Sequence, residues 1–116
     1  MTATIEQVGE SRSAEGQGTK LKGRVAFVTG GTRGIGAAIS KSLASQGATV
    51  AAGYCRNTEQ AQKFLAELTA ASDGAEVSVH QGDVGCGTDC KRTIQEVIDL
   101  HGRLDILINN AGITID

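Results

Sequence analysis

Short apolar segments alternate with longer segments of helical periodicity from Leu21 onward, and this alternation restricts the fold more than any other feature. Apolar strands are predicted at residues 25–28, 49–53, 75–79 and 104–108. Helices are predicted between them, at residues 34–46, 58–71 and 88–101. Parallel strands joined by helices form right-handed crossovers, and such strands are apolar on both faces because helices cover both sides of the sheet. The sequence therefore predicts an α/β fold, a Rossmann-like parallel sheet with flanking helices that is truncated after its fourth strand.

Apolar residues recur every three or four positions in each predicted helix, which indicates one buried face per helix. For the first helix the predicted inward residues are Ile35, Ala38, Ile39 and Leu43. For the second they are Ala61, Phe64, Leu65 and Leu68, and for the third they are Ile94, Val97, Ile98 and Leu100. Asn57 is a predicted N-cap, and glycines at 47 and 102 are predicted to end the first and third helices.

Residues 1–20 differ from the rest of the chain in composition. They are rich in Gly, Ser, Thr, Gln and Glu and have few apolar side chains, so a flexible tail is predicted. Over all 116 residues, 40% are hydrophobic, 21% are charged and the formal net charge is -2. This balance favours one globular domain at residues 21–116 and gives no indication of a nucleic-acid partner. No apolar run of about 18 residues is present, so no membrane association is predicted.

The three cysteines, Cys55, Cys86 and Cys90, do not suggest a disulfide framework. An odd number in a chain without a signal-peptide pattern favours a reducing compartment, so a cytoplasmic location is predicted. Cys86 and Cys90 could combine with His80 or His101, but the paired spacing typical of zinc ligands is missing and no metal site is predicted.

A glycine-rich turn at residues 29–36, Thr-Gly-Gly-Thr-Arg-Gly-Ile-Gly, lies between the first predicted strand and the first predicted helix. A pyrophosphate at a helix N-terminus needs free backbone N–H groups and no side chains in its way, which glycines provide. Gly31 and Gly36 have P-loop spacing, but Ala37 and Ala38 follow in place of Lys and Ser or Thr, which disfavours a nucleotide triphosphatase. A turn without a ligand would need one glycine rather than four.

Three motifs together resemble the short-chain dehydrogenase/reductase family. They are Thr-Gly-x-x-x-Gly-x-Gly after the first strand, Asp83-Val84 after the third, and Asn-Asn-Ala-Gly at residues 109–112 after the fourth. The resemblance covers residues 22–116. The ending Asn-Asn-Ala-Gly-Ile-Thr-Ile-Asp is most similar to 3-oxoacyl-carrier-protein reductases and acetoacetyl-CoA reductases, although Ile115 stands where that subgroup has arginine.

The resemblance implies a cofactor role for each matching residue. The pyrophosphate and the adenosine ribose would be held by Gly30, Gly31, Thr32, Arg33, Gly34, Ile35 and Gly36. The adenine would lie along Asp83 and Val84, and the nicotinamide ribose would lie near Asn110, Ala111 and Gly112. Two structural alternatives stay open: Asp83 could cap the next helix, and Asn109 and Asn110 could be a pair of buried amides that tie neighbouring strands together.

The cofactor's ribose is predicted to carry a 2′-phosphate. Sites for NAD place an acid at the end of the second strand, which falls here at about Tyr54, and no Asp or Glu lies between residues 49 and 58. Arg33 and Arg56 could instead bind a phosphate, with Cys55 beside it and no chemistry assigned to that thiol. NADP(H) is therefore the predicted cofactor. The alternative is that both arginines are solvated surface residues.

The catalytic residues of the family are not found in these 116 residues. Its hydride chemistry needs a tyrosine followed four positions later by a lysine, whereas the single tyrosine, Tyr54, is followed at that distance by Thr58. The chain therefore resembles the N-terminal, cofactor-binding half of an NADPH-dependent reductase. The resemblance implies a small-molecule 3-oxoacyl thioester substrate, a place in fatty acid metabolism and a homo-oligomer for the complete enzyme.

Two other functions stay open. The first is a non-catalytic NADP-binding module or remnant that works at this length. The second is a Rossmann-like methyltransferase, which the missing acid after the second strand disfavours. A sheet that ends at residues 104–108 would also leave an exposed apolar edge, so poor solubility is predicted for the isolated chain.

Overall fold

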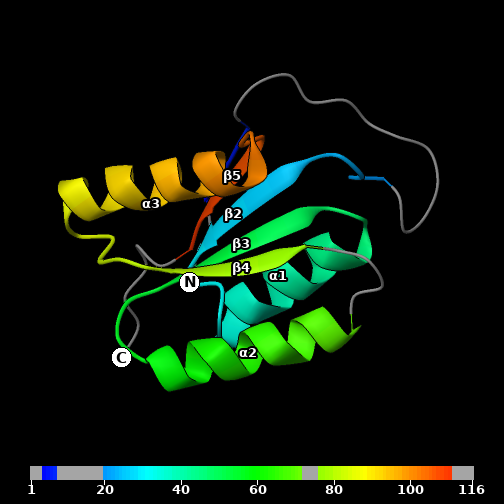
Figure 1. Cartoon of the computed structure of the whole chain (residues 1–116), viewed down its shortest axis with the longest axis horizontal. Coiled ribbons are helices and arrows are strands. Elements are labelled where there is room, and N and C mark those ends of the chain that lie inside the picture. Colours follow the sequence, from blue (N-terminus) through cyan, green and yellow to red (C-terminus); the bar gives the residue numbers. More distant parts are fainter. Residues whose placement is uncertain (1–3, 8–19, 72–75, 111–116) are drawn as a thin grey trace.

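The computed structural model describes residues 4–7, 20–71 and 76–110, and a five-stranded sheet forms its centre. The strands are β1 (Thr4–Gln7), β2 (Val25–Thr29), β3 (Thr49–Tyr54), β4 (Val77–Gln81) and β5 (Ile106–Asn109). The helices are α1 (Gly34–Ser45), α2 (Thr58–Ala71) and α3 (Gly87–His101). The order across the sheet is β1-β5-β2-β3-β4, and β2 to β5 are all parallel. Helices α1 and α2 cover one face and α3 covers the other (Figure 1), so the predicted Rossmann-like α/β fold is confirmed.

Strand β2 is central and buried on both faces, as its continuous apolar sequence predicts. Val25 and Phe27 pack on the α3 side in a cluster with Val97 of that helix. Ala26 and Val28 pack on the opposite side with residues of β5 and α1. Because successive side chains of a strand point to opposite faces, β2 contributes to both layers of the core.

Helix α2 has the predicted inward face, but α1 and α3 differ from prediction. On α1 the buried residues are Gly36, Ser40 and Ala44, whereas Ile35 is 49% exposed. These small residues, spaced by four, let the helix approach the sheet closely, so the apolar stripe is not the face of closest contact. On α3, Val97 is buried but Leu100 is 60% exposed, because that residue lies on the side turned away from the sheet.

The structure confirms two of the predicted helix ends and shifts the start of two predicted strands. The Asn57 side chain accepts a hydrogen bond from the N–H of Gln60 at 2.9 Å, as expected of an N-cap of α2. Gly102 ends α3 with φ at 86°, a left-handed conformation that glycine adopts without strain. Strand β4, at residues 77–81, and strand β5, at residues 106–109, begin two residues later than predicted.

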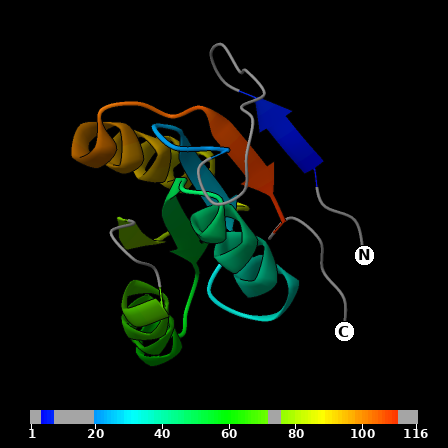
Figure 2. The same ribbon diagram turned by 90° about the vertical axis from the view of Figure 1, so that its right-hand side faces the viewer.

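The N-terminal segment corrects two predictions. Thr4–Gln7 form β1, which pairs antiparallel with β5 over four residue pairs, so the predicted flexible tail is wrong for these residues (Figure 2). The rest of that prediction falls on residues 1–3 and 8–19, outside the described residues, and on Lys20. The predicted free edge at the last strand is also wrong, because β1 provides that strand with a hydrogen-bonding neighbour. A four-residue strand inside a polar segment carries no periodicity from which it could have been predicted.

The amino ends of β2 and β5 are joined by Asp105, which is 2% exposed. Its carboxylate accepts the Val25 N–H at 2.8 Å, and its own N–H donates to the Val25 carbonyl at 2.9 Å. Arg103 binds the same carboxylate through two nitrogens, and the Arg24 guanidinium lies 3.6 Å away. Burial alone would raise the pKa of Asp105, but these donors and charges hold it below its ordinary value.

In the described part of the chain, no helix combines the length and the apolar character that crossing a membrane requires.

Candidate functional site

The glycine-rich turn joins the carboxyl end of β2 to α1, and its glycines are required for different reasons. Gly30 and Gly34 have φ values of 64° and 60°, where any side chain would be strained. A Cβ at Gly31 would lie 2.8 Å from the Val28 carbonyl oxygen. A Cβ at Gly36 would collide with the Gly30 carbonyl oxygen, whereas one at Gly34 would meet nothing within 4 Å. The turn is therefore packed tightly on its inner side and open at Gly34, which begins the helix.

The N-terminus of α1 is open to an anionic ligand. Its N-cap, Arg33, makes no side-chain capping hydrogen bond, and the first turn contains no acidic residue. The first N–H groups of a helix have no partners within the helix, and they form the positive end of its dipole. An N-terminus without a capping side chain or an acidic residue, behind a glycine turn, is an arrangement that suits a phosphate.

Three hydrogen bonds hold the turn against its neighbours. The Gly31 N–H donates to the Gly53 carbonyl of β3 at 3.0 Å, and the Ser40 hydroxyl donates to the Gly31 carbonyl at 3.1 Å. The Gln60 side chain of α2 donates to the Thr32 carbonyl at 3.3 Å. Ser40 and Gln60 were missed by sequence reasoning. Ser40 could have been found, since it follows Gly36 by four residues on the same helix face, whereas Gln60 carries no sequence pattern.

Thr29, Asn109 and Asn110 form a second group at the carboxyl ends of β2 and β5. The Thr29 hydroxyl lies 3.3 Å from the Asn109 side-chain oxygen, and the Asn110 N–H donates to that hydroxyl at 2.9 Å. The Asn110 amide nitrogen reaches the Gly30 carbonyl at 3.5 Å. Both asparagines thus contact β2 or the turn after it, but Asn109 is exposed and not buried as the structural alternative assumed. The Asn110 Oδ1 atom is nevertheless buried and has no hydrogen-bond partner among the described residues, so it could accept a hydrogen bond from a ligand.

Residues predicted around the adenosine follow β3. Tyr54 is half-buried at the end of that strand, and Cys55 and Arg56 are exposed after it. Arg33 is exposed at the start of α1. Among residues 4–7, 20–71 and 76–110, neither Arg33 nor Arg56 has an ion-pair partner, so both guanidinium groups could bind a phosphate. Ala111 and Gly112 of the predicted site lie outside the described residues.

Asp83 and Val84 are both exposed after β4. One Asp83 carboxylate oxygen accepts the Gly85 N–H at 2.8 Å, and the Asp83 N–H donates to the Asp89 carboxylate at 2.9 Å. The N-cap of α3 is Cys86, which makes no side-chain capping bond. Asp83 therefore organises the turn before the helix and does not cap the helix, so this alternative role is not the one observed.

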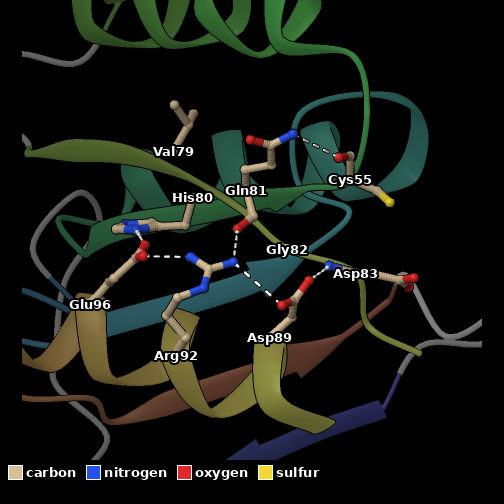
Figure 3. Close-up of a pocket in the computed structure, with 9 residues that line it drawn as sticks. All are labelled: Cys55, Val79, His80, Gln81, Gly82, Asp83, Asp89, Arg92 and Glu96. Carbon is tan, nitrogen blue, oxygen red and sulfur yellow. Dashed lines mark hydrogen bonds and ion pairs between the residues drawn. The ribbon is translucent and has the colours of Figure 1, made fainter. Parts of the chain in front are cut away.

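A pocket of about 420 Å³ lies between β4 and α3, beside the residues that are predicted to contact the cofactor's adenosine (Figure 3). It is lined by Cys55, Val79, His80, Gln81, Gly82, Asp83, Asp89, Arg92 and Glu96. Only Cys55 and Asp83 belong to the predicted cofactor site.

The cationic side chain in this pocket, Arg92, already has hydrogen-bond and ion-pair partners. The Arg92 guanidinium donates to the Gln81 carbonyl at 2.7 Å and to Glu96 at 2.6 Å, and it lies 3.8 Å from Asp89. Burial would raise the pKa of Glu96, but hydrogen bonds from His80 and Arg92 lower it, so the carboxylate stays charged. Two acids neutralise the cation, which disfavours this pocket as a phosphate site. No group of three or more metal-binding side chains occurs within the described ranges.

Comparison with known sequences identifies the family. A model of the "short chain dehydrogenase" family matches residues 24–116. The NADPH-dependent aldehyde reductase 1 of Arabidopsis thaliana is 45% identical over 97 residues, which are 80% of this chain and 34% of the relative. The acetoacetyl-CoA reductase of Shinella zoogloeoides is 45% identical over 93 residues, which are 80% of this chain and 36% of the relative.

Two further relatives bear on the fold and the length. A short-chain dehydrogenase from Burkholderia cenocepacia, solved in complex with NADP, superposes with a TM-score of 0.67 at 39% identity, covering 72% of this chain and 34% of that one. The homolog YusS of Bacillus subtilis is 41% identical, and the match covers 78% of this chain and 82% of that protein.

The chain spans about a third of the length of the larger relatives. The matched part contains the glycine turn, the Asp83 turn and the asparagine pair, each at the carboxyl end of a parallel strand. The family model covers nearly all of the described sheet and its three helices. This chain therefore belongs to the short-chain dehydrogenase/reductase family, whose members are oxidoreductases that use nicotinamide cofactors.

Proposed function

We propose that residues 21–116 form the NADP(H)-binding part of a short-chain reductase that reduces a 3-oxoacyl thioester to the 3-hydroxy form. The observation that carries the cofactor assignment is the uncapped N-terminus of α1 behind the glycine turn. The buried Oδ1 of Asn110, which has no partner in residues 4–7, 20–71 and 76–110, supports it independently, because that side chain lies beside the same turn. A bound nicotinamide would supply a hydride to the carbonyl carbon of the substrate.

Different residues of the chain would bind different parts of the cofactor. The free N–H groups of the turn would hold the pyrophosphate, and Arg33 and Arg56 would hold the 2′-phosphate. Asp83 and Val84 would contact the adenine. Asn110, together with Ala111 and Gly112, would line the path to the nicotinamide ribose.

The substrate is the finer part of the proposal. It is supported by the sequence ending at residues 109–116 and by the likeness to an acetoacetyl-CoA reductase. The aldehyde reductase is equally identical over its matched region, so the carbonyl class needs a direct test. Comparison of acetoacetyl-CoA, a 3-oxoacyl carrier protein and a simple aldehyde, each with NADPH and the protein from its native source, would decide between them. Turnover of the aldehyde alone would contradict the thioester.

Cofactor binding can be tested on the 116-residue chain itself. Titration with NADPH and with NADH, followed by the fluorescence of the nicotinamide, should show NADPH binding more tightly by about tenfold or more, since two charge-assisted contacts distinguish them. Absence of saturable NADPH binding by a folded chain would contradict the proposal. No turnover is expected from this chain, because Tyr54 is its single tyrosine and Thr58 stands in place of the lysine.

The second candidate function is a non-catalytic NADP-binding module. It is supported by the short relative YusS, because the match covers 82% of that protein. The intact mass of the protein from its native source distinguishes the two candidates. A mass near 11.9 kDa would favour the module, and a much larger mass would favour the reductase. For either candidate a reducing, cytoplasmic location is supported by the free thiols of Cys55, Cys86 and Cys90.

A further inference from the structure

Two carbonyl groups of the glycine turn are held by side chains from two different helices. The Ser40 hydroxyl of α1 donates to the Gly31 carbonyl at 3.1 Å, and the Gln60 amide of α2 donates to the Thr32 carbonyl at 3.3 Å. Both helices cover the same face of the sheet (Figure 1). Two consecutive peptide groups, 31–32 and 32–33, are therefore fixed by residues that lie outside the turn.

The hydroxyl of Ser40 is not explained by helix packing. Gly36 and Ala44 lie one turn before and one turn after it on the buried face of α1, and neither has a polar side chain. A serine inside a helix commonly points to solvent or donates to the carbonyl four residues earlier. Ser40 is 0% exposed and donates instead to Gly31, which lies outside its own helix. Alanine at this position would pack as closely, so the hydroxyl is accounted for by its contact with the turn.

These two hydrogen bonds also determine the direction of the N–H groups that follow the carbonyls. In a trans peptide group the C=O and the next N–H point in opposite directions, and the described residues contain no cis peptide bond. The Gly31 carbonyl faces Ser40, so the Thr32 N–H points away from α1. The Thr32 carbonyl faces Gln60, so the Arg33 N–H points away from α2. Within the described part of the chain neither N–H donates a hydrogen bond, and both are available to a ligand.

Gln60 also connects the two segments that carry the arginines proposed for the 2′-phosphate. Arg33 follows Thr32 directly, and Arg56 lies in the segment just before α2. The N–H of Gln60 donates to the Asn57 side chain at 2.9 Å, which fixes the backbone of Gln60 to that segment. The hydrogen bond from the Gln60 side chain to the turn therefore holds the backbone at Arg33 in place relative to the backbone at Arg56.

We propose that Ser40 and Gln60 are positioning residues for the cofactor, which hold two carbonyls of the glycine turn so that the N–H groups after them face its phosphates. Gln60 also increases the preference for NADP(H) over NAD(H), because it connects the segments of the two arginines. Donors that are already oriented need no rearrangement when the ligand binds, which raises the affinity. The inference rests on the proposed NADP(H) site and adds two residues that the sequence motifs do not include.

The first test is Ser40→Ala, which removes the hydroxyl and keeps a small side chain. In NMR spectra of the free chain, the carbonyl carbon signal of Gly31 should move upfield, because a hydrogen bond to the oxygen deshields that carbon. The Kd values for NADPH and for NADH should both rise by about tenfold. Ser45→Ala is the matched control, because the Ser45 hydroxyl donates to the Ser42 carbonyl at 2.7 Å at the other end of α1. It should leave the Gly31 signal and both Kd values unchanged.

The second test is Gln60→Met, which keeps a long side chain and removes the donor. The Kd for NADPH should rise by about tenfold and that for NADH by about threefold at most, since only NADPH carries the 2′-phosphate. A loss of stability alone would weaken both cofactors by the same factor, so the ratio of the two Kd values isolates the positioning role. Gln62→Met, at an exposed glutamine of the same helix, is the matched control and should change neither Kd.

The outcomes separate this inference from the proposed function. Saturable NADPH binding by the unaltered chain, with the same Kd in folded Ser40→Ala and Gln60→Met, would overturn the positioning roles alone. Equal weakening of NADPH and NADH by Gln60→Met would overturn its role in cofactor preference. Absence of NADPH binding by the unaltered chain would contradict the proposed function and this inference with it.

A further variant covers the case in which Ser40→Ala does not fold. Ser40→Cys keeps the shape of the side chain and replaces the hydroxyl with a weaker donor. Its Kd values for both cofactors should rise, by less than tenfold. Unchanged Kd values in folded Ser40→Cys, together with an upfield Gly31 carbonyl signal, would show that the hydrogen bond is not needed for binding and would overturn the role of Ser40.

Discussion

The two ends of the same sheet are built in opposite ways. At the amino ends of β2 and β5, the buried Asp105 receives hydrogen bonds from Val25 and Arg103, and the charges there are paired. At the carboxyl ends of the same strands, α1 begins without a side-chain cap, and the buried Oδ1 atom of Asn110 has no partner within the described part of the chain. Polar groups left unsatisfied in a folded protein need an explanation, and a ligand is one.

This difference teaches where stability and binding reside in the chain. The amino end satisfies its own groups and so contributes to folding. The carboxyl end leaves donors and acceptors free, in the region where open α/β sheets bind ligands. Changes at the first end should therefore alter the free energy of unfolding without altering NADPH affinity, whereas changes at the second should alter affinity.

Asp105→Ala should give the largest effect. It removes a buried carboxylate and leaves the Val25 N–H without its side-chain acceptor, so the free energy of unfolding should fall by about 3 kcal/mol. Denaturant unfolding measures this change. Asp99→Ala is the control, because Asp99 is an exposed acid on α3, and it should change stability by less than about 0.5 kcal/mol. A large loss of NADPH affinity in folded Asp105→Ala would contradict the claim that the amino end of the sheet takes no part in binding.

Gly36→Ala should disturb the glycine turn at the carboxyl end of β2. The added methyl group would collide with the Gly30 carbonyl and displace the turn, which should cost about 2 kcal/mol of stability. NADPH affinity should also fall by about tenfold or more, since the N–H groups that face the phosphate would move. Gly87→Ala is the matched control at the start of α3, where a Cβ meets nothing within 4 Å. Equal NADPH affinity in the unaltered chain and in folded Gly36→Ala would contradict the assignment.

Arg33→Ala and Arg56→Ala separate the 2′-phosphate from the rest of the cofactor. Each should weaken NADPH binding by about tenfold, or about 1.4 kcal/mol, and leave NADH binding unchanged. Calorimetric titration with both cofactors measures the difference. Lys63→Ala, an exposed cation on α2, is the control and should affect neither. Equal losses for NADPH and NADH would show that the arginines do not read the phosphate.

The smallest expected effect concerns pH and two buried groups. The His101 side chain is 3% exposed, its Nε2 lies 2.8 Å from the Ser78 hydroxyl, and its Nδ1 lies 3.5 Å from Glu76. Burial lowers the pKa of His101, the nearby Glu76 opposes this, and His80 adds to the lowering. The folded chain therefore binds this proton less readily than the unfolded chain does.

The sign of the pH dependence follows from linkage. Stability should fall as the pH drops below about 6.5, where the unfolded His101 takes up its proton, and His101→Gln should remove this part of the slope. The lowered pKa of Asp105 acts in a more acidic window, because its stabilisation is lost as the pH falls below about 3.8 and through the lowered value. Urea unfolding at a series of pH values measures both. Stability that rises from pH 7 to pH 5 would contradict the assignment to His101.

Most of the fold could be predicted from the sequence, because the parallel strands and their helices have strong periodicities. The glycine turn was also predictable, since its backbone conformations and close contacts permit few other residues. The inward face of α1 was not predictable from hydrophobicity, because close packing selected Gly36, Ser40 and Ala44 over larger apolar residues. Strand β1 was not predictable either, since it exists through long-range pairing with β5 rather than through its own composition.

In the candidate site, too, some features could be predicted from the sequence and others could not. The motifs identified the residues at the carboxyl ends of β2, β4 and β5, and the structure brings the glycine turn and Asn110 into contact. The supporting contacts of Ser40 and Gln60 depend on how three elements pack, which no local pattern records. Nor could the sequence show that Asp83 organises a turn instead of capping α3.

The central claim is that the carboxyl end of this sheet binds NADP(H) and the amino end does not. Titration of the isotopically labelled 116-residue chain with NADPH, followed residue by residue through the amide signals in NMR spectra, tests it most directly. If NADPH binds at the carboxyl end, the amide signals of residues 30–36, Asp83 and Asn110 should shift, and those of Val25 and Asp105 should stay unchanged. Shifts confined to Asp105 and its neighbours, or to the pocket around Arg92 and Glu96, would contradict it.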